Sequence, residues 1–169
     1  MRAAPGTAPQ GSPAPLPVRA ARTRPGPATR QTSLLIGPVT TAPMTARGVV
    51  RASLATWGLG HLTEDAEAIT SELVTNAYTA STEKAPPGTE PQPLTLWMTA
   101  EQGALRIRVW DPDPTPPPES PADPGLLAEL LAEHGRGLVI VQSLSDQWGW
   151  HPAPNGGKYV WALLVTVTG

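Results

Sequence analysis

The stretch ITSELVTNAYTAS, from Ile69 to Ser81, decides how the rest of the chain is interpreted. Its apolar residues recur at the three- and four-residue spacing of a helix that buries one face. Glu72 and Asn76 lie four residues apart and therefore share a stripe, about one residue round from the apolar stripe. Such a pair at the edge of a core helix indicates either an ordinary solvated face or a helix that turns polar groups toward a ligand.

The composition excludes several classes of protein. A chain of 169 residues is long enough for one domain with a tail and can bury a core. Because it has no cysteine, disulfides, thiolate chemistry and cysteine metal sites are excluded, which agrees with a reducing cytoplasm. No apolar run is as long as a membrane span, and the N-terminus lacks the apolar core of a signal peptide. We therefore expect a cytoplasmic protein with no membrane partner.

The charge is unevenly distributed along the chain. Seven of the 12 basic residues precede Glu64, the first acid, so the remainder carries 5 bases against 14 acids. A basic arm can bind nucleic acid or an acidic partner. These arginines are scattered among Ala, Pro and Gly without interleaved aromatic residues, which argues against a nucleic-acid partner.

Residues 1–29 are rich in Pro, Ala, Gly and Arg and contain few large apolar side chains. Such a segment cannot bury enough apolar surface to offset its ordering entropy, so we predict a disordered tail. An organellar transit peptide is the alternative, because the segment is basic and free of acids. The second predicted unit, residues 30–169, is the folded domain.

Periodicity and turn residues predict the elements of this domain. Seven prolines in the 14 residues of 111–124 exclude a regular element there, and Thr63 is expected to be the N-cap of its helix. Strands are expected at 32–37, 94–100, 104–111, 147–152 and 156–167. Helices are expected within 41–60, where Gly58 and Gly60 end the helix, within 61–81 after Thr63, at 125–133, and within 134–146 after a glycine loop. This order predicts an α+β fold, a two-layer sandwich of a mixed sheet with helices on one face.

Chemistry can be assigned to the polar pair on the helix. The Asn76 carbonyl oxygen is a hard ligand of the kind that Mg²⁺ prefers, and this ion is usually held by few protein groups plus phosphates and water. The Glu72 carboxylate, one turn earlier, could act as a general base on water or a substrate hydroxyl.

Two further polar features interrupt the apolar pattern. Asp111 ends a predicted strand, where it could accept a hydrogen bond from an exocyclic amine such as that of adenine, or could simply begin an Asp-Pro turn. Gly135 and Gly137 flank Arg136 at a predicted helix start, which would offer free backbone N–H groups and positive charge to phosphate. The alternative is an ordinary loop. Together the three features outline a site for a purine nucleotide with Mg²⁺.

The segments ELVTNA, VWDPDPTPP, GRGLVIVQSLSDQWGW and GGKYVWALL, in this order, resemble the motifs of the GHKL (histidine kinase-like) ATPase superfamily. The likeness spans about residues 30–167 and is closest to the short stand-alone bacterial proteins related to anti-sigma-factor serine kinases, common in actinomycetes. It implies the Bergerat-type ATP-binding fold, with ATP and Mg²⁺ as ligands.

The resemblance also implies roles for individual residues. Glu72 matches the family's catalytic base, Asn76 the ligand of Mg²⁺, and Asp111 the reader of the adenine amine. The second glycine box, where backbone amides meet phosphate at the lid, corresponds to the GRGL segment: Gly135, Arg136, Gly137 and Leu138.

Several positions depart from the family pattern, among them Thr79 and Ala80, which stand where the short relatives often have Arg-His. Asp113 stands between two prolines where the first glycine box has a small residue, which adds a charge beside the nucleotide. Tyr159 is expected where many relatives have Thr beside the adenine. These departures leave ATP binding as the expectation and put catalysis in question.

The resemblance implies a serine/threonine kinase that transfers the γ-phosphoryl group of ATP to a partner protein, a sigma factor or its antagonist. The alternative is a non-catalytic module that holds such a partner in an ATP-dependent way. A third interpretation is a plain α+β interaction domain with a vestigial pocket. The sequence leaves homodimer formation open.

Overall fold

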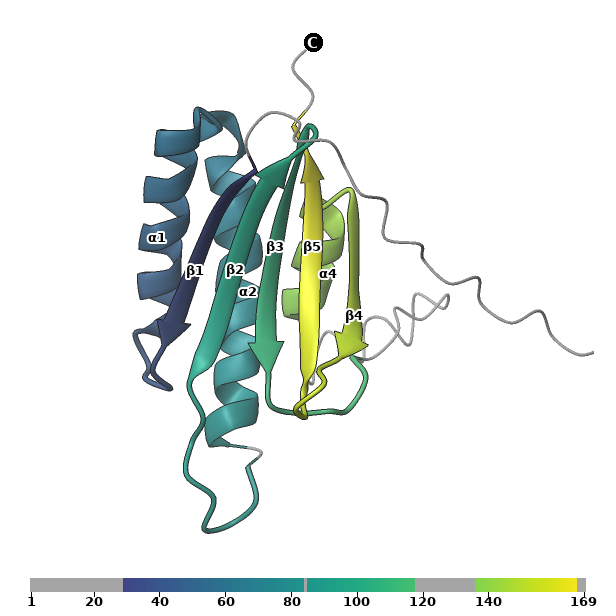
Figure 1. Ribbon diagram of the computed structural model, residues 1–169. Coiled ribbons are helices and arrows are strands. Elements are labelled where there is room, and N and C mark those ends of the chain that lie inside the picture. Colours follow the sequence, from purple (N-terminus) through teal and green to yellow (C-terminus); the bar gives the residue numbers. More distant parts are fainter. Residues whose placement is uncertain (1–28, 84, 118–135, 167–169) are drawn as a thin grey trace, which may run out of the picture.

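The computed structural model describes residues 29–83, 85–117 and 136–166. Within them, helices cover one face of a single sheet (Figure 1). The elements in chain order are β1 (Arg30–Ile36), α1 (Ala42–Trp57), the 3₁₀ turn η1 (Gly60–Leu62), α2 (Thr63–Thr82), β2 (Leu94–Glu101), β3 (Ala104–Asp111), α4 (Arg136–Leu144), β4 (Gln147–Pro152) and β5 (Lys158–Val165). The predicted tail and the helix predicted at 125–133 lie outside the described residues, except that the tail's last residue, Thr29, is described.

The strands are ordered β1-β2-β3-β5-β4, and each neighbouring pair is antiparallel. The two-layer α+β architecture is therefore confirmed, whereas the prediction of a mixed sheet is wrong. Two helices that run up and back separate β1 from β2, so the chain re-enters the sheet in the opposite direction (Figure 1). A single crossover helix would have made this pair parallel.

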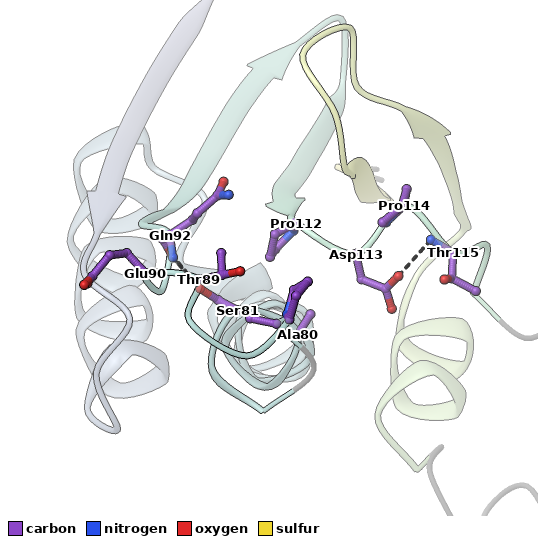
Figure 2. Close-up of a pocket in the computed structure, with 11 residues that line it drawn as sticks. Ala80, Ser81, Thr89, Glu90, Gln92, Pro112, Asp113, Pro114 and Thr115 are labelled. Carbon is purple, nitrogen blue, oxygen red and sulfur yellow. Dashed lines mark hydrogen bonds between the residues drawn. The ribbon is translucent and has the colours of Figure 1, made fainter.

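The segment between α2 and β2 is fastened to the helix by one buried hydroxyl. Ser81 Oγ donates a hydrogen bond to the carbonyl of Gln92 and accepts one from its backbone N–H, each at 2.8 Å (Figure 2). Since both backbone groups of Gln92 are satisfied by a single side chain, the chain enters β2 at a fixed position relative to α2.

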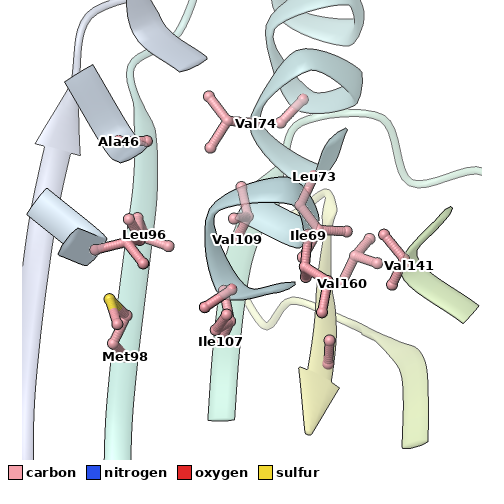
Figure 3. Packing of buried hydrophobic residues seen from close by; sticks show 14 of the residues in the cluster. Ala46, Ile69, Leu73, Val74, Leu96, Met98, Ile107, Val109, Val141 and Val160 are labelled. Carbon is pink, nitrogen blue, oxygen red and sulfur yellow. The ribbon is translucent and has the colours of Figure 1, made fainter. Parts of the chain in front are cut away.

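Strand alternation builds the sheet side of the core (Figure 3). Every second residue of the three central strands faces the helices, which buries Leu94, Leu96, Met98, Leu105, Ile107, Val109, Val160, Ala162 and Leu164. Each large aliphatic side chain buried in this way contributes about 1.5–3 kcal/mol. The opposite face of the sheet carries no helix among the described residues.

The helices meet this sheet through narrow apolar stripes. In α1 the buried residues are Ala42, Ala46, Val50 and Leu54, whereas Met44 is 60% exposed. Two of these four residues are alanines, whose small side chains let α1 pack closely against its neighbours.

Of the apolar stripe expected at Leu62, Ala66, Ile69, Leu73, Ala77 and Ala80, helix α2 buries the last five, whereas Leu62 lies before the helix and is partly buried. Thr63 is the first residue of α2 rather than its N-cap, and no side chain caps the helix. The prediction was wrong because η1 leads directly into α2, which leaves no extended residue at the cap position.

Candidate functional site

A cavity of about 480 Å³ lies where α2, the ends of β3 and β5, the proline loop and the first turn of α4 meet. Its size is in the range of small-molecule sites. It is lined by Leu73, Asn76, Thr79, Ala80, Val109, Asp111, Asp113, Thr115, Pro116, Pro117, Leu138, Lys158 and Val160.

The fold brings four of the predicted site residues to this cavity. Asn76 comes from α2, Asp111 from the end of β3, Asp113 from the loop that follows, and Leu138 from the first turn of α4. These segments are up to 62 positions apart in the sequence, between 76 and 138, so only the tertiary fold joins them.

Glu72 does not line the cavity, although it lies one helical turn from Asn76. Its carboxylate packs against the first turn of α4, where a Cβ added at Gly137 would lie 2.6 Å from Glu72 Oε2. A glycine at 137 therefore makes room for this carboxylate, at the helix end whose dipole favours negative charge. Gly135 lies outside the described residues, and Arg136 is described only as the first residue of α4.

Asp111 is held by a buried network. Its Oδ1 accepts a hydrogen bond from the backbone N–H of Asp113 at 2.8 Å, and its Oδ2 lies 3.1 Å from Lys158 Nζ. The same ammonium donates to the Asp113 carbonyl at 2.6 Å. The side chains of Lys158 and Asp111 are 5% and 9% exposed, so this is a buried ion pair whose charged partners compensate each other.

Burial raises the pKa of Asp111 above its ordinary value. The positive charge of Lys158 and the hydrogen bond from Asp113 act in the opposite direction and offset part of this effect. The Asp111 carboxylate is therefore a desolvated acceptor that depends on Lys158 for its charge.

Asp113 shapes the proline loop. Its Oδ1 accepts a hydrogen bond from the backbone N–H of Thr115 at 2.9 Å (Figure 2). Asp111 makes the same kind of bond to the N–H of Asp113, so each of the two aspartates closes a turn over the two residues that follow it. The prolines fix φ along the same stretch. The loop thus has aspartate turns in place of the conformational freedom that a glycine would give.

Lys158 was missed by the sequence reasoning, and the place expected for Tyr159 is wrong. Tyr159 lies on the open face of the sheet, where its ring is 4.8 Å from the Arg108 guanidinium and 5.4 Å from the Trp97 ring. Lys158 pairs directly with Asp111 in the strand register and lines the cavity. The alternation of Val160 and the residues beyond it could have revealed this, because Lys158 shares their face.

A second cavity of about 430 Å³ adjoins the first, with Ala80, Asp113 and Thr115 lining both. It lies between the C-terminal turn of α2, the 85–92 segment and the proline loop (Figure 2). Because Ser81 fixes the 85–92 segment to α2, the walls of this cavity are set by the same contacts that position β2.

The donor set fits a magnesium ion held mainly by phosphate. No group of three or more His, Cys, Asp or Glu side chains that could hold a metal occurs in the described part of the chain. Asn76 offers one hard oxygen at the cavity wall, as a site completed by phosphates and water requires.

None of the helices described in the structure combines the length and the hydropathy that a membrane crossing needs.

An amide and a buried carboxylate converge on one cavity of this α+β domain, beside a glycine-containing helix start. The sequence profile of the histidine kinase-like ATPase domain matches residues 40–163, which include every site residue described above. The chain therefore belongs to the histidine kinase-like ATPase family.

Two solved structures share the fold of this chain. The RsbU and RsbW domains of Rv1364c from Mycobacterium tuberculosis match with a TM-score of 0.53 and 18% identity, over 83% of this chain and 33% of that chain. The SiaB–SiaC complex from Pseudomonas aeruginosa matches with a TM-score of 0.58 and 12% identity, over 80% of this chain and 90% of that chain. This chain thus spans a third of the length of the first of these relatives. No curated protein sequence matches the chain significantly.

Proposed function

We propose that this chain is an ATP-binding regulator of the anti-sigma-factor type, which transfers the γ-phosphoryl group to a serine or threonine of a partner protein. The observation that carries the proposal is the convergence of Asn76, Asp111 and Leu138 on one cavity in a chain of the histidine kinase-like ATPase family. In this proposal the adenine lies at Asp111 and the triphosphate points toward the first turn of α4.

Glu72 is the proposed general base. Its carboxylate lies against Gly137 in the first turn of α4, the end of the cavity at which the terminal phosphate is proposed to lie. Glu72 would accept the proton of the partner's hydroxyl, the hydroxyl oxygen would form a bond to the γ-phosphorus, and the bond to the bridging oxygen would break to release ADP. Mg²⁺ on the phosphates, with Asn76 as a proposed ligand, would neutralise the charge that develops there.

The partner is proposed to be a sigma factor or its antagonist, met in the cytoplasm. The resemblance of the sequence motifs to the anti-sigma-factor kinases supports this proposal, as do the fold neighbours, which include an RsbW domain and a SiaB–SiaC complex. A homodimer would be compatible with the same activity and remains a separate proposal.

Label transfer tests the proposed reaction. Candidate antagonists and sigma factors are incubated with the protein and γ-labelled ATP, with Glu72→Gln as the matched variant of nearly equal volume. We expect label on serine or threonine with the wild type only, while both proteins bind ATP. If the Glu72→Gln variant transfers phosphate at the wild-type rate, Glu72 is not the base.

A non-catalytic module is the second candidate, because Glu72 packs against α4 and does not line the cavity. On this interpretation ATP orders the site, and the ordered surface holds the partner without chemistry. Partner binding that requires ATP, tolerates Glu72→Gln and leaves no label on the partner would favour this candidate.

A further inference from the structure

Lys158 has a hydrogen-bonding capacity that the internal network does not use up. An ammonium has three N–H donors. Among the described residues, Lys158 is directed at two acceptors, the Asp111 carboxylate and the Asp113 carbonyl. One donor is therefore left at the wall of the cavity that Lys158 lines.

The Asp111 carboxylate, in turn, has hydrogen-bond acceptor positions that the internal network leaves unused. An ionised carboxylate offers about four acceptor positions. Within the described residues, the Asp113 N–H and the Lys158 ammonium take up two of them. The pair thus presents a hydrogen-bond donor and a hydrogen-bond acceptor, side by side, to whatever occupies the cavity.

We propose that Lys158 is a second nucleobase-reading residue of this site. The Watson–Crick edge of adenine places a donor, the N6 amine, next to an acceptor, the ring nitrogen N1. Asp111 would accept from N6–H, and Lys158 would donate its remaining N–H to N1. The inference rests on the proposed ATP site and adds to it the residue that recognises N1.

The chemistry of the pair explains why a lysine suits this position. A hydrogen bond from an ammonium to a ring nitrogen is charge-assisted, and such bonds are about twice as strong as neutral ones. Asp111 already compensates the buried charge, so Lys158 can contact the base without leaving its partner. Tyr159 cannot take this role, because its ring packs against Arg108 on the other face of the sheet.

Base analogues test the proposal without altering the protein. ATP, 1-deaza-ATP and 7-deaza-ATP are titrated calorimetrically into the full chain with Mg²⁺. Since 1-deaza-ATP lacks only the N1 acceptor, we expect it to bind about tenfold more weakly than ATP or worse. The control, 7-deaza-ATP, keeps both N1 and N6 and should bind like ATP.

The variant Lys158→Met then links the effect to the residue. It removes the donor, so ATP should bind about tenfold more weakly and the difference between ATP and 1-deaza-ATP should disappear. If wild-type protein binds 1-deaza-ATP as tightly as ATP, Lys158 does not read N1, although ATP binding stands. Tighter ATP binding by Lys158→Met would overturn the proposal in favour of a lysine that blocks the site. If none of the three nucleotides binds, the proposed function fails and the inference fails with it. Should Lys158→Met not fold, the wild-type comparison decides alone.

Discussion

The turn between β4 and β5 offers a comparison of two adjacent glycines, Gly156→Ala and Gly157→Ala. Both residues have positive φ, +95° at Gly156 and +72° at Gly157, so alanine is strained at either position. They differ in their surroundings. A Cβ at Gly156 would meet nothing within 4 Å, whereas one at Gly157 would lie 2.4 Å from the Asp111 carbonyl oxygen and 3.1 Å from Pro112 Cα.

These contacts set the expected magnitudes. The positive φ costs an alanine about 1–2 kcal/mol, and the less flexible unfolded chain returns about 0.4–1 kcal/mol, so Gly156→Ala should lose roughly 1 kcal/mol. Gly157→Ala has the same two free-energy contributions. In addition, its Cβ collides with backbone atoms, and no change of side-chain rotamer can relieve that collision. Forced overpacking adds about 1–3 kcal/mol, for a total of roughly 2–4 kcal/mol.

Thermal and chemical unfolding of the two variants measure the difference. For a domain of this size, we expect Gly156→Ala to lower Tm by about 4 °C and Gly157→Ala by about 8–15 °C. The Gly157 variant should also bind ATP more weakly, because the displaced carbonyl belongs to Asp111. Equal losses of stability in both variants would refute the reasoning, since the two glycines differ chiefly in the contact with Asp111.

Three further predictions concern the contacts around the site. Ser81→Ala should cost about 1–3 kcal/mol in urea unfolding, because both backbone groups of Gln92 lose their partner, and proteolysis within residues 83–93 should become faster. Unchanged stability and proteolysis would contradict this. Gly137→Ala should change stability by less than about 1 kcal/mol, because the added Cβ clashes only with the flexible end of Glu72 and is at ordinary contact distance from its Cβ, but should abolish phosphotransfer. Wild-type transfer would show that the position of Glu72 is unimportant. NMR titration should give Asp111 a pKa above its ordinary value. A native pKa that is raised means that the folded protein binds the proton more tightly. The contribution of this group to stability is therefore full below the unfolded pKa and is lost as the pH rises through the folded pKa. An Asp111 pKa at or below 3.8 would contradict the assignment of burial as the dominant cause.

Much of the fold could be predicted from the sequence because its elements have clear periods. The alternating strands and the apolar stripe of α2 could be recognised from their periods. These elements also fix where Asn76 and Asp111 lie, and both residues line the cavity. Local patterns could not give the direction of β2, since it depends on how the two preceding helices return the chain. The missing cap at Thr63 was not predictable from the cap pattern alone, because a 3₁₀ turn directly precedes α2 and leaves no extended residue at the cap position.

Lys158 illustrates the limit of such predictions most clearly. A lysine at the first residue of a strand is ordinarily expected in water, since burying its charge is unfavourable without a partner. Its partner, Asp111, is 47 residues earlier in the chain and is brought opposite only by the pairing of β3 with β5. The two charges compensate each other only because the strand register places them opposite one another, and no single segment of the sequence encodes that register.

The most direct test of the account is calorimetric titration of ATP into the wild-type chain and the Asn76→Ala variant, each with and without Mg²⁺. We predict Mg²⁺-dependent binding by the wild type that is lost or strongly weakened in Asn76→Ala, because the proposed protein ligand of the ion is removed. No binding by the wild type at millimolar ATP would contradict the proposed site. So would an ATP affinity that is the same with and without Mg²⁺ and the same in the wild type and Asn76→Ala.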